Sequence, residues 1–516
     1  MENEVLVAKN ISKSYVGVRA LDNVSVTIHA GEVKCLAGEN GCGKSTFVKI
    51  IAGVEQADKG EGSIVINGKR YPKSKHNVIS AIEAGVQVIY QDLSLFDNMT
   101  VAENIAMNKL IKEKRKKVNK KEVYEIAKNA LDMIGVTMDL DAVVQTVSIA
   151  NRQIIAICRA LALDAKLLFM DEPTTALTNK EIKRLLQIVL KLKEKGIAVV
   201  FISHKLDEVL EVADSITVFR DGKQVADISK QDMDLKKLIY YMTGREVEYK
   251  HYIRKDQKSD DPVLEIKGFT KKGQFNNINL SVRAGDILGL TGLLGSGRTE
   301  MALSVFGLNQ ADAGEVWMNG KKLKIKSPVD AVKNGIALLP EDRGTQGLLL
   351  EKDLTDNVSS AIFDRMTNKI GILDDKKREK LAEETIKSLR VKIPNARTLI
   401  KTLSGGNQQK VVLGKWIATE PKVFILDTPT VGVDVGSKSE IYEHIQNLAD
   451  QGIAVIIISD EVEEIVANCN RVAVMFEGEI VKEFEEDVMA RNDAEKEISA
   501  AIGSLSINTN NEEEAV

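Results

Sequence analysis

Residues 38–46 read GENGCGKST and fit the pattern G-x-x-x-x-G-K-[ST] at every fixed position. The glycines let the backbone turn until its N–H groups converge on one point, where the positive end of the following helix would hold an anion. We expect this loop to bind the phosphates of a nucleotide through all of its residues: Gly38, Glu39, Asn40, Gly41, Cys42, Gly43, Lys44, Ser45 and Thr46. Lys44 would neutralise the β- and γ-phosphates, and the Ser45 hydroxyl would bind Mg²⁺.

Length and composition predict a folded protein of at least two domains. The chain has 516 residues, of which 44% are hydrophobic and 28% charged. Its net charge of -4 gives no general reason to expect nucleic acid or anionic lipid as a partner. No apolar run approaches the roughly 18 to 20 residues that cross a bilayer, and the acidic start is unlike a signal peptide, so we expect a cytoplasmic protein. The cysteines fit no metal spacing and are predicted to be buried.

The chain repeats itself. Residues 21–46 (LDNVSVTIHAGEVKCLAGENGCGKST) return as residues 275–300 (FNNINLSVRAGDILGLTGLLGSGRTE), a shift of 292 − 38 = 254. LLFMDEPT at 167–174 returns as VFILDTPT at 423–430, a shift of 427 − 171 = 256. This indicates a tandem duplication of a domain of about 250 residues. We expect a first domain at 1–245, a linker at 246–262, a second domain at 263–500 and an acidic, disordered tail at 501–516.

Within each half, short apolar strands alternate with helix-period runs. This order predicts an α/β fold with a mostly parallel sheet flanked by helices. A helical insertion is expected between Gln91 and Leu161, and between Glu341 and Ile417. The basic run KLIKEKRKKVNKK at 109–121 lacks the aromatic neighbours of a nucleic-acid patch and is predicted to be a solvated connection.

Further candidate residues follow the buried strands of the first half. Asp171 would bind the Mg²⁺, and Glu172 would orient or deprotonate the water that attacks the γ-phosphate. His204 follows another strand and would contact the γ-phosphate, while Gln91 would reach the metal and the water. Tyr15 is predicted either to stack on a base or simply to pack.

A signature sequence then makes the resemblance specific. LSGGNQQK at 403–410 precedes the second acidic strand, and the altered VSIANRQ at 147–153 is its counterpart. Together with the phosphate loop, it resembles the nucleotide-binding domain of an ATP-binding cassette (ABC) protein, a phosphate-loop NTPase. The resemblance implies that two such domains pack head to tail. The first site would then be completed by residues of the second half: Ser404, Gly405, Gly406, Gln408 and Asp434.

The second site departs from this pattern. Its loop is expected to consist of Gly292, Gly295, Gly297, Arg298 and Thr299, with arginine in place of lysine. Glu341 replaces the glutamine, Thr428 the catalytic base and Asp460 the histidine, and this site faces the altered signature. Threonine cannot act as a base, and Asp460 would repel the γ-phosphate. We therefore expect one hydrolytic site, and one degenerate site with a regulatory or structural role.

Three segments narrow the resemblance to one group. PEDRGTQGLLL at 340–350, GLLGSGRTE at 292–300 and TPTVGVDVGSKSEIY at 428–442 resemble bacterial monosaccharide importers of the ribose, galactose and xylose type, to which nucleoside and autoinducer-2 importers are related. This implies a translocase-class ATPase, peripheral on the cytoplasmic face of the cell membrane, which uses ATP and Mg²⁺.

Its partners would be membrane permease subunits and, through them, a periplasmic or extracellular solute-binding protein. The permease would contact residues 92–105 and the segment after Glu341. The apolar members of residues 92–105 alternatively pack within the insertion: Leu93, Leu95, Phe96 and Met99. The runner-up is a ribosome-associated or regulatory ATPase, followed by a DNA-repair protein. The short linker and degenerate second half favour the importer.

Overall fold

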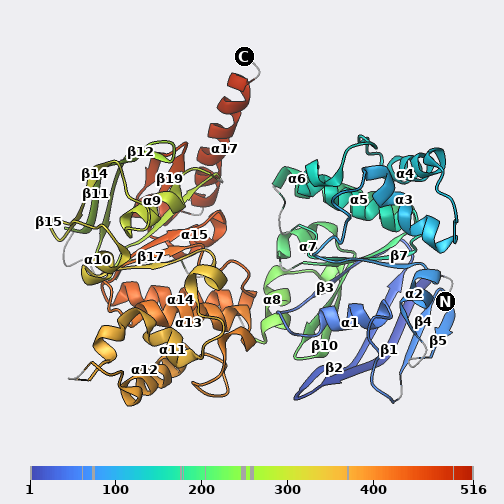
Figure 1. The fold of residues 1–516 in the computed structure, drawn as a ribbon, viewed down its shortest axis with the longest axis horizontal. Coiled ribbons are helices and arrows are strands. Elements are labelled where there is room, and N and C mark those ends of the chain that lie inside the picture. Colours follow the sequence, from blue (N-terminus) through green and yellow to red (C-terminus); the bar gives the residue numbers. More distant parts are fainter. Residues whose placement is uncertain are drawn as a thin grey trace. The chain divides into compact units, whose positions relative to one another are not determined.

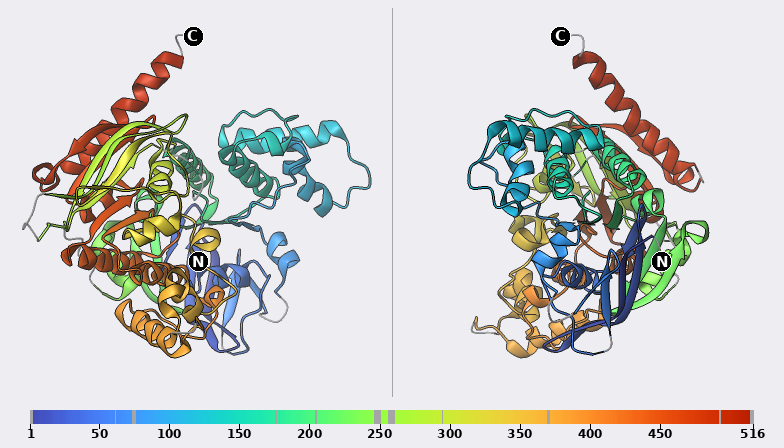
Figure 2. Two further views of the ribbon diagram at one scale, coloured as in Figure 1. Left: turned by 60° about the vertical axis from the view of Figure 1, so that its left-hand side comes forward. Right: turned by 90° about the vertical axis from the view of Figure 1, so that its right-hand side faces the viewer.

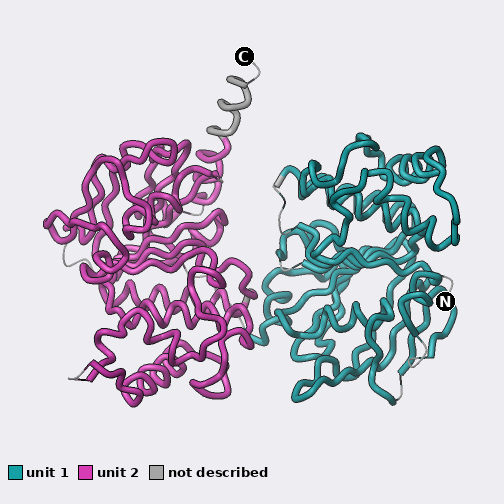
Figure 3. Tube along the Cα trace, in the orientation of Figure 1, with its two compact units in different colours: residues 1–247 teal, residues 248–516 magenta. Residues whose placement is uncertain are grey.

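The computed structural model divides the chain into two compact units, Met1–Val247 and Glu248–Val516 (Figure 3). Each unit is described by itself. The structure describes residues 3–60, 62–72, 76–174, 177, 179–203, 205–245, 251–255, 261–293, 295–368, 371–491 and 493–513, without the side chains of Asn179, Val435 and residues beyond 503. His204 lies outside the described residues, as do residues 246–250 and 256–260 of the expected linker.

Unit 1 contains two sheets. The four-stranded sheet is antiparallel and has the order β2 (Val18–His29), β1 (Glu4–Tyr15), β4 (Ser63–Ile66), β5 (Lys69–Tyr71). The six-stranded sheet has the order β10 (Lys223–Ser229), β9 (Ser215–Arg220), β3 (Val33–Ala37), β8 (Ala198–Ile202), β7 (Leu167–Asp171), β6 (Val86–Ile89), and only the β9–β10 pair is antiparallel.

The helices of unit 1 fall into a group beside the sheets and a separate insertion. Those near the sheets are α1 (Lys44–Ile51), α2 (Val78–Glu83), α6 (Asn179–Glu194), α7 (Leu206–Val212), the 3₁₀ turn η2 (Lys230–Asp232) and α8 (Leu235–Thr243). The insertion comprises α3 (Val101–Lys112), α4 (Lys120–Ile134), the 3₁₀ turn η1 (Val144–Thr146) and α5 (Ile149–Leu161). In Figures 1 and 2, α3, α4 and α5 lie together, away from the antiparallel sheet.

Unit 2 repeats this plan. Its antiparallel sheet is β12 (Phe275–Arg283), β11 (Pro262–Lys271), β14 (Ala313–Met318), β15 (Lys321–Lys322). Its larger sheet is β16 (Ile336–Leu339), β17 (Val423–Asp427), β18 (Ala454–Ile458), β13 (Ile287–Gly292), β19 (Arg471–Phe476), β20 (Glu479–Phe484). The helical elements are α9 (Arg298–Val305), α10 (Pro328–Lys333), the π turn η3 (Arg343–Gly347), α11 (Leu354–Ser359), the 3₁₀ segment η4 (Ser360–Met366), α12 (Asp375–Ser388), the 3₁₀ turn η5 (Ile400–Thr402), α13 (Gly405–Ile417), α14 (Val435–Asp450), α15 (Val462–Asn468), α16 (Glu486–Met489) and α17 (Ala494–Glu513).

The α/β fold predicted from the sequence is confirmed, and the parallel strands show why the apolar runs are continuous. Every residue of β3 and β8 is buried, as expected for strands covered on both faces. The antiparallel sheets were not predicted. The three-residue step from Tyr15 to Val18 forces β1 and β2 to run in opposite directions, because a parallel pair needs a long crossover. The first helix of each unit packs between the two sheets in one hydrophobic core.

All four cysteines are free and buried, as the sequence predicted. Burial raises the pKa of the thiol of Cys158 to about 12. These side chains therefore act as small apolar groups of the cores.

Residues 251–255, which belong to the expected linker, pack against the rest of unit 2. Tyr252 is buried, and its hydroxyl donates to the backbone oxygen of Gly285 at 3.0 Å. Arg254 is also buried, and its Nε donates to Ala284 O at 3.0 Å. The polar composition of residues 246–262 predicts a linker. The side chains of Tyr252, Arg254 and Lys255 are nevertheless bound by backbone oxygens and a carboxylate, which lets residues 251–255 pack.

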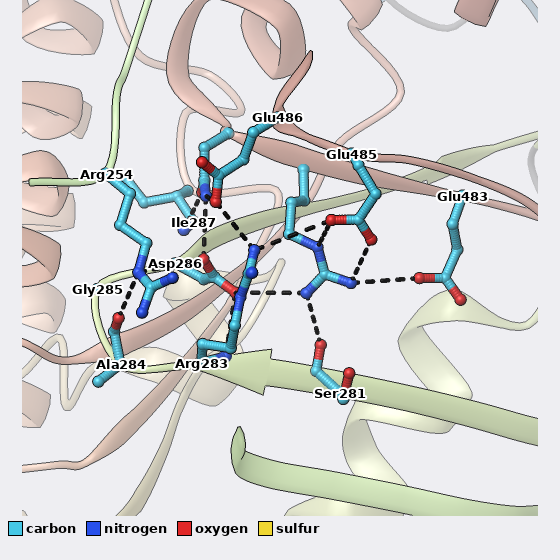
Figure 4. Close-up of polar contacts among 12 residues, drawn as sticks. Arg254, Ser281, Arg283, Ala284, Gly285, Asp286, Ile287, Glu483, Glu485 and Glu486 are labelled. Carbon is cyan, nitrogen blue, oxygen red and sulfur yellow. Dashed lines mark hydrogen bonds and ion pairs between the residues drawn. The ribbon is translucent and has the colours of Figure 1, made fainter. Parts of the chain in front are cut away.

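Arg254 reaches an ionic cluster around Asp286, which lies directly before β13 (Figure 4). Asp286 is fully buried and accepts from Asn470 Nδ2 at 3.0 Å and Arg283 Nε at 3.0 Å. Burial by itself would raise the pKa of Asp286, but the hydrogen bonds from Asn470 and Arg283 outweigh it and lower the pKa. These contacts fix the position of the start of β13, the strand that leads to the second phosphate loop.

The last helix, α17, runs from Ala494 to Glu513 and so overlaps residues 501–516, for which the sequence predicts a disordered tail. The limits of this tail stay a prediction. Among the described residues, no helix is long and apolar enough to cross a membrane.

Candidate functional site

The first phosphate loop connects β3 to α1 and has the backbone that its glycines permit. Gly38, Gly41 and Gly43 have φ values of 146°, 81° and 108°. A Cβ on Gly38 would lie 2.2 Å from Phe219 O, and one on Gly43 would lie 2.4 Å from Ala20 O. Both positions therefore require glycine for space as well as for conformation.

Lys44 is the first residue of α1 and lies inside this loop. Its Nζ donates to the backbone oxygens of Gly38 at 2.6 Å and Glu39 at 3.0 Å, and lies 3.6 Å from Cys42 Sγ. These partners carry no formal charge, so the ammonium charge remains available to an anion at the helix start. Ser45 and Thr46 follow Lys44 in the first turn of the same helix.

Asp171 is the last residue of β7 and Glu172 follows it, and β8 separates β7 from β3 in the sheet. Burial and the neighbouring Glu172 raise the pKa of Asp171, while Lys44 opposes this shift. Glu172 has a left-handed backbone with φ 46°, and its N–H donates to Ile202 O at 2.9 Å. The topology thus brings the lysine and the two carboxylates together at the carboxyl edge of one sheet.

Two more expected residues lie on the surface of unit 1. Gln91 follows β6 and is exposed. Tyr15 at the end of β1 is 44% exposed, and Lys13 Nζ lies 5.2 Å from the centre of its ring. An exposed ring at a strand end is available for stacking on a base, the role that remains a prediction for Tyr15.

The signature residues begin α13 of unit 2. Ser404 is the N-cap residue, and its Oγ accepts from Asn407 Nδ2 at 2.9 Å. A Cβ on Gly406 would lie 2.5 Å from Ser437 Oγ, so glycine lets α13 approach the start of α14. Asp434 caps that start by accepting from Ser437 N at 2.9 Å.

Gln408, the last of the expected signature residues, is held by backbone oxygens. Its Nε2 donates to Ile400 O and Leu403 O, both at 3.2 Å. In unit 1 the corresponding helix begins with Ile149 in place of Gly405, and this isoleucine is 54% exposed. A branched apolar side chain therefore lies where the second copy has only backbone.

The second loop has kept the backbone of the first. Gly292, Gly295 and Gly297 have φ values of 152°, 81° and 94°, close to their counterparts. Thr428 has φ 48° and donates its N–H to Ile458 O at 2.9 Å, as Glu172 does in unit 1. A β-branched residue is strained in this region, so Thr428 occupies a conformation that its own side chain disfavours.

Arg298 of the second loop contacts residues that follow β18, and Thr299 contacts Asp427, the last residue of β17. Arg298 is buried, forms an ion pair with Asp460 and donates to Ser459 O at 3.2 Å. Burial raises the pKa of Asp427, and hydrogen bonds from Thr299 and Thr428 oppose this shift. The sequence indicated that Asp460 would repel phosphate, but it did not reveal that Asp460 is the partner of Arg298.

Arg343 is a further residue that the sequence analysis did not single out. It begins η3, and its Nη1 donates to Val431 O at 2.6 Å, in the loop that follows the second acidic strand. Its Nη2 lies 2.8 Å from the point where a Cβ on Gly405 would be. The motif PEDRG contained it, but its partners lie 88 residues away.

A cavity of about 480 Å³ adjoins Arg343 and is lined by residues of η3, the signature helix and the loop after β17: Glu341, Asp342, Arg343, Gly344, Leu350, Lys401, Gln408 and Val431. Glu341 is thus placed beside the signature segment of the same unit. This arrangement connects the segment after β16 to the start of α13.

Comparison with protein families matches residues 21–175 and 275–431 to the ABC transporter family. The chain belongs to this family, with two ABC domains in tandem, and it is of the ATPase subunit class. The prediction from the phosphate loop and the signature is thereby confirmed.

Particular relatives extend over nearly the whole chain. "Ribose import ATP-binding protein RbsA" of Clostridium tetani is 41% identical over 483 residues, covering 93% of this chain and 94% of the relative. "Putative ribose/galactose/methyl galactoside import ATP-binding protein 1" of Agrobacterium fabrum is 39% identical over 482 residues, covering 93% and 94%. Among solved structures, the ADP conformation of MJ1267, an ATP-binding cassette of an ABC transporter, aligns at 26% identity and TM-score 0.42, covering 47% of this chain and 99% of that chain.

Proposed function

We propose that the chain is the ATP-hydrolysing subunit of an importer for a monosaccharide or a related solute. ATP binding and hydrolysis at one competent site would drive uptake through separate membrane subunits. The sugar is inferred from the names of relatives about 40% identical over more than 90% of both chains. The observation that carries the catalytic proposal is the strand order of the larger sheet of unit 1, because β3, which leads to Lys44, and β7, which ends at Asp171, lie on either side of β8.

The proposed reaction uses groups of unit 1. The loop N–H groups and Lys44 hold the β- and γ-phosphates, and Glu172 accepts a proton from the attacking water. The water oxygen bonds to the γ-phosphorus, and the bond to the bridging oxygen breaks, releasing ADP and phosphate. His204 and Gln91 are assigned to the γ-phosphate and the water, and Tyr15 to the adenine.

The residues beside Lys44 also suit Mg²⁺. The hydroxyl of Ser45, the carboxylate of Asp171 and the amide oxygen of Gln91 are the oxygen donors that this ion prefers. Burial and then the negative charge of Glu172 raise the pKa of Asp171, and a nearby cation would relieve the repulsion between the two carboxylates. When bound, the ion would neutralise charge that develops on the phosphates.

We propose further that residues of the second domain complete this site: Ser404, Gly405, Gly406, Gln408 and Asp434. We also propose that the two domains extend over residues 1–245 and 263–500. Support comes from the start of α13, where Gly405 and Gly406 are the first two residues and add no side chain of their own beside the N-terminal N–H groups of the helix. The second loop, from Gly292 to Thr299, would be degenerate, because Thr428 offers no base and Arg298 is already paired.

The proposed partners are permease subunits at the cytoplasmic face of the membrane and, through them, a solute-binding protein outside it. Phe96 supports this contact, since its side chain is 49% exposed in the segment after Gln91. A large apolar side chain exposed in a loop is typical of a surface that packs on a partner.

Hydrolysis by the reconstituted importer tests the catalytic assignment. Glu172→Gln should lower ATP turnover by at least about 100-fold, because loss of a general base typically costs 10²- to 10⁴-fold, while ATP binding persists. The matched control is Thr428→Gln, which places the same side chain at the corresponding left-handed position of unit 2. It should leave turnover within about threefold of wild type. Similar losses in both variants, or full activity of Glu172→Gln, would contradict the proposal.

A further inference from the structure

The cations of the two phosphate loops differ in what they already bind. Both donate to backbone oxygens of their own loop, Lys44 to Gly38 and Glu39 and Arg298 to Leu293. Arg298, the counterpart of Lys44, is also bound to the carboxylate of Asp460, whose position corresponds to His204 at 460 − 204 = 256. The Arg298 side chain is only 7% exposed, whereas that of Asp460 is 58% exposed. The second loop therefore carries its own anion beside its cation.

This pairing uses the shape of the guanidinium group. Nη1 donates to Ser459 O, and Nη2 donates to Asp460 and to Leu293 O, so the group joins the second loop to the first two residues after β18. A lysine ammonium is a single point charge and lacks this planar fork. The change to arginine and the change to aspartate thus form one ion pair.

The residues of the second site that correspond to the proposed Mg²⁺ ligands of the first site also contact one another or their neighbours. Thr428 Oγ1 donates to Asp427 Oδ1 at 3.1 Å, and the Thr299 hydroxyl also contacts this carboxylate. A nucleotide entering the site would have to replace these contacts in addition to the ion pair. The cost is largest for a third phosphate, since it is anionic and competes with Asp460 for Arg298.

We propose that Asp460 takes the place of a γ-phosphate at Arg298 and makes the second loop select against nucleoside triphosphates. A diphosphate lacks the competing group and is affected much less. Asp460 is thus a specificity-determining residue. The inference rests on the proposed function, because it requires that residues 292–299 bind a nucleotide.

Photolabelling of the full chain tests this inference with 8-azido-ATP and 8-azido-ADP as probes, followed by proteolysis and mass spectrometry of peptides from each unit. Asp460→Asn should raise triphosphate labelling of unit 2 by about tenfold, equivalent to about 1.4 kcal/mol, and diphosphate labelling by less than about threefold. Labelling of unit 1 should not change. Asp460→His, which restores the residue of the first copy, should behave in the same direction.

The matched control is Glu461→Gln, which removes one negative charge from the adjacent residue. Glu461 is 59% exposed and is bound to Lys438 at 3.1 Å, not to Arg298. It should leave both labels unchanged. The inference is overturned if wild type already labels unit 2 with triphosphate as strongly as unit 1, if both Asp460 variants leave labelling unchanged, or if diphosphate gains equally. Turnover of Glu172→Gln is a separate measurement, so failure here is distinguishable from failure of the proposed function.

Discussion

Lys415 of the signature helix provides a test of how burial acts on stability. Its side chain lies among apolar residues of unit 2, and its Nζ donates to Gly347 O at 2.5 Å, at the end of η3. Burial lowers the pKa of Lys415 to about 8. We predict that Lys415→Met stabilises unit 2 at pH 7, because methionine fills similar space without a charge.

The magnitude follows from the difference between the folded and unfolded pKa values. An unfolded lysine titrates near pH 10.4, so a folded value of about 8 corresponds to roughly 3 kcal/mol. Below pH 8 the side chain is charged in both states, and the full cost of burying it is present. Between about pH 8 and 10 the unfolded chain binds more protons, so wild type gains stability as the pH rises. Losing one hydrogen bond costs Lys415→Met about 1 kcal/mol, leaving a net gain of about 2 kcal/mol at pH 7.

Tryptophan fluorescence during urea unfolding measures this effect in the full chain. The protein has two tryptophans, Trp317 and Trp416, and both belong to unit 2. The advantage of Lys415→Met should shrink between pH 8 and 10, while Lys380→Met, at a 77% exposed side chain, should differ little from wild type at any pH. A Lys415→Met protein that is less stable than wild type at pH 7, or an advantage independent of pH, would refute the reasoning.

Three more predictions concern the two units. Lys44→Ala should lower ATP turnover of the reconstituted importer by at least about 100-fold, whereas Arg298→Ala should keep most of it; equal losses would contradict the assignment of one hydrolytic site. Tyr252→Phe should destabilise unit 2 by about 1 kcal/mol in urea unfolding, because the hydroxyl no longer donates to Gly285 O, which would be left without this donor. Phe96→Ser should leave urea unfolding unchanged but reduce permease-stimulated turnover, and unaltered stimulation would argue against the proposed contact.

The duplicated loops share one backbone conformation although their side chains differ. Gly292 and Gly297 still have the backbone of Gly38 and Gly43, because a Cβ at these positions would collide with backbone oxygens. Thr428 likewise keeps the left-handed conformation of Glu172. Steric constraints therefore preserve the shape of the loop, whereas side-chain chemistry is free to change.

Much of the fold and of the candidate site could be predicted because the motifs are local. The residues from Gly38 to Thr46 combine spacing and conformation in nine positions, and the repeat shows that the pattern occurs twice. Alternation of apolar strands and helices predicted the parallel sheets. The roles of Glu172, Gln91 and the signature residues remain predictions, since they depend on ligands and on residues from both units.

By itself the sequence determined the class of protein, the duplication and the residues that differ between the two copies. Spacing along the chain is sufficient for these features, because a glycine-rich turn, a strand and a helix start are each specified by neighbouring residues. Only the tertiary structure decided that Arg298 is paired with Asp460, 162 residues away. It also decided that Tyr252 and Arg254 of the expected linker are hydrogen-bonded to unit 2. Parallel strands bring distant positions to one edge of a sheet, and burial then decides which polar groups must find each other.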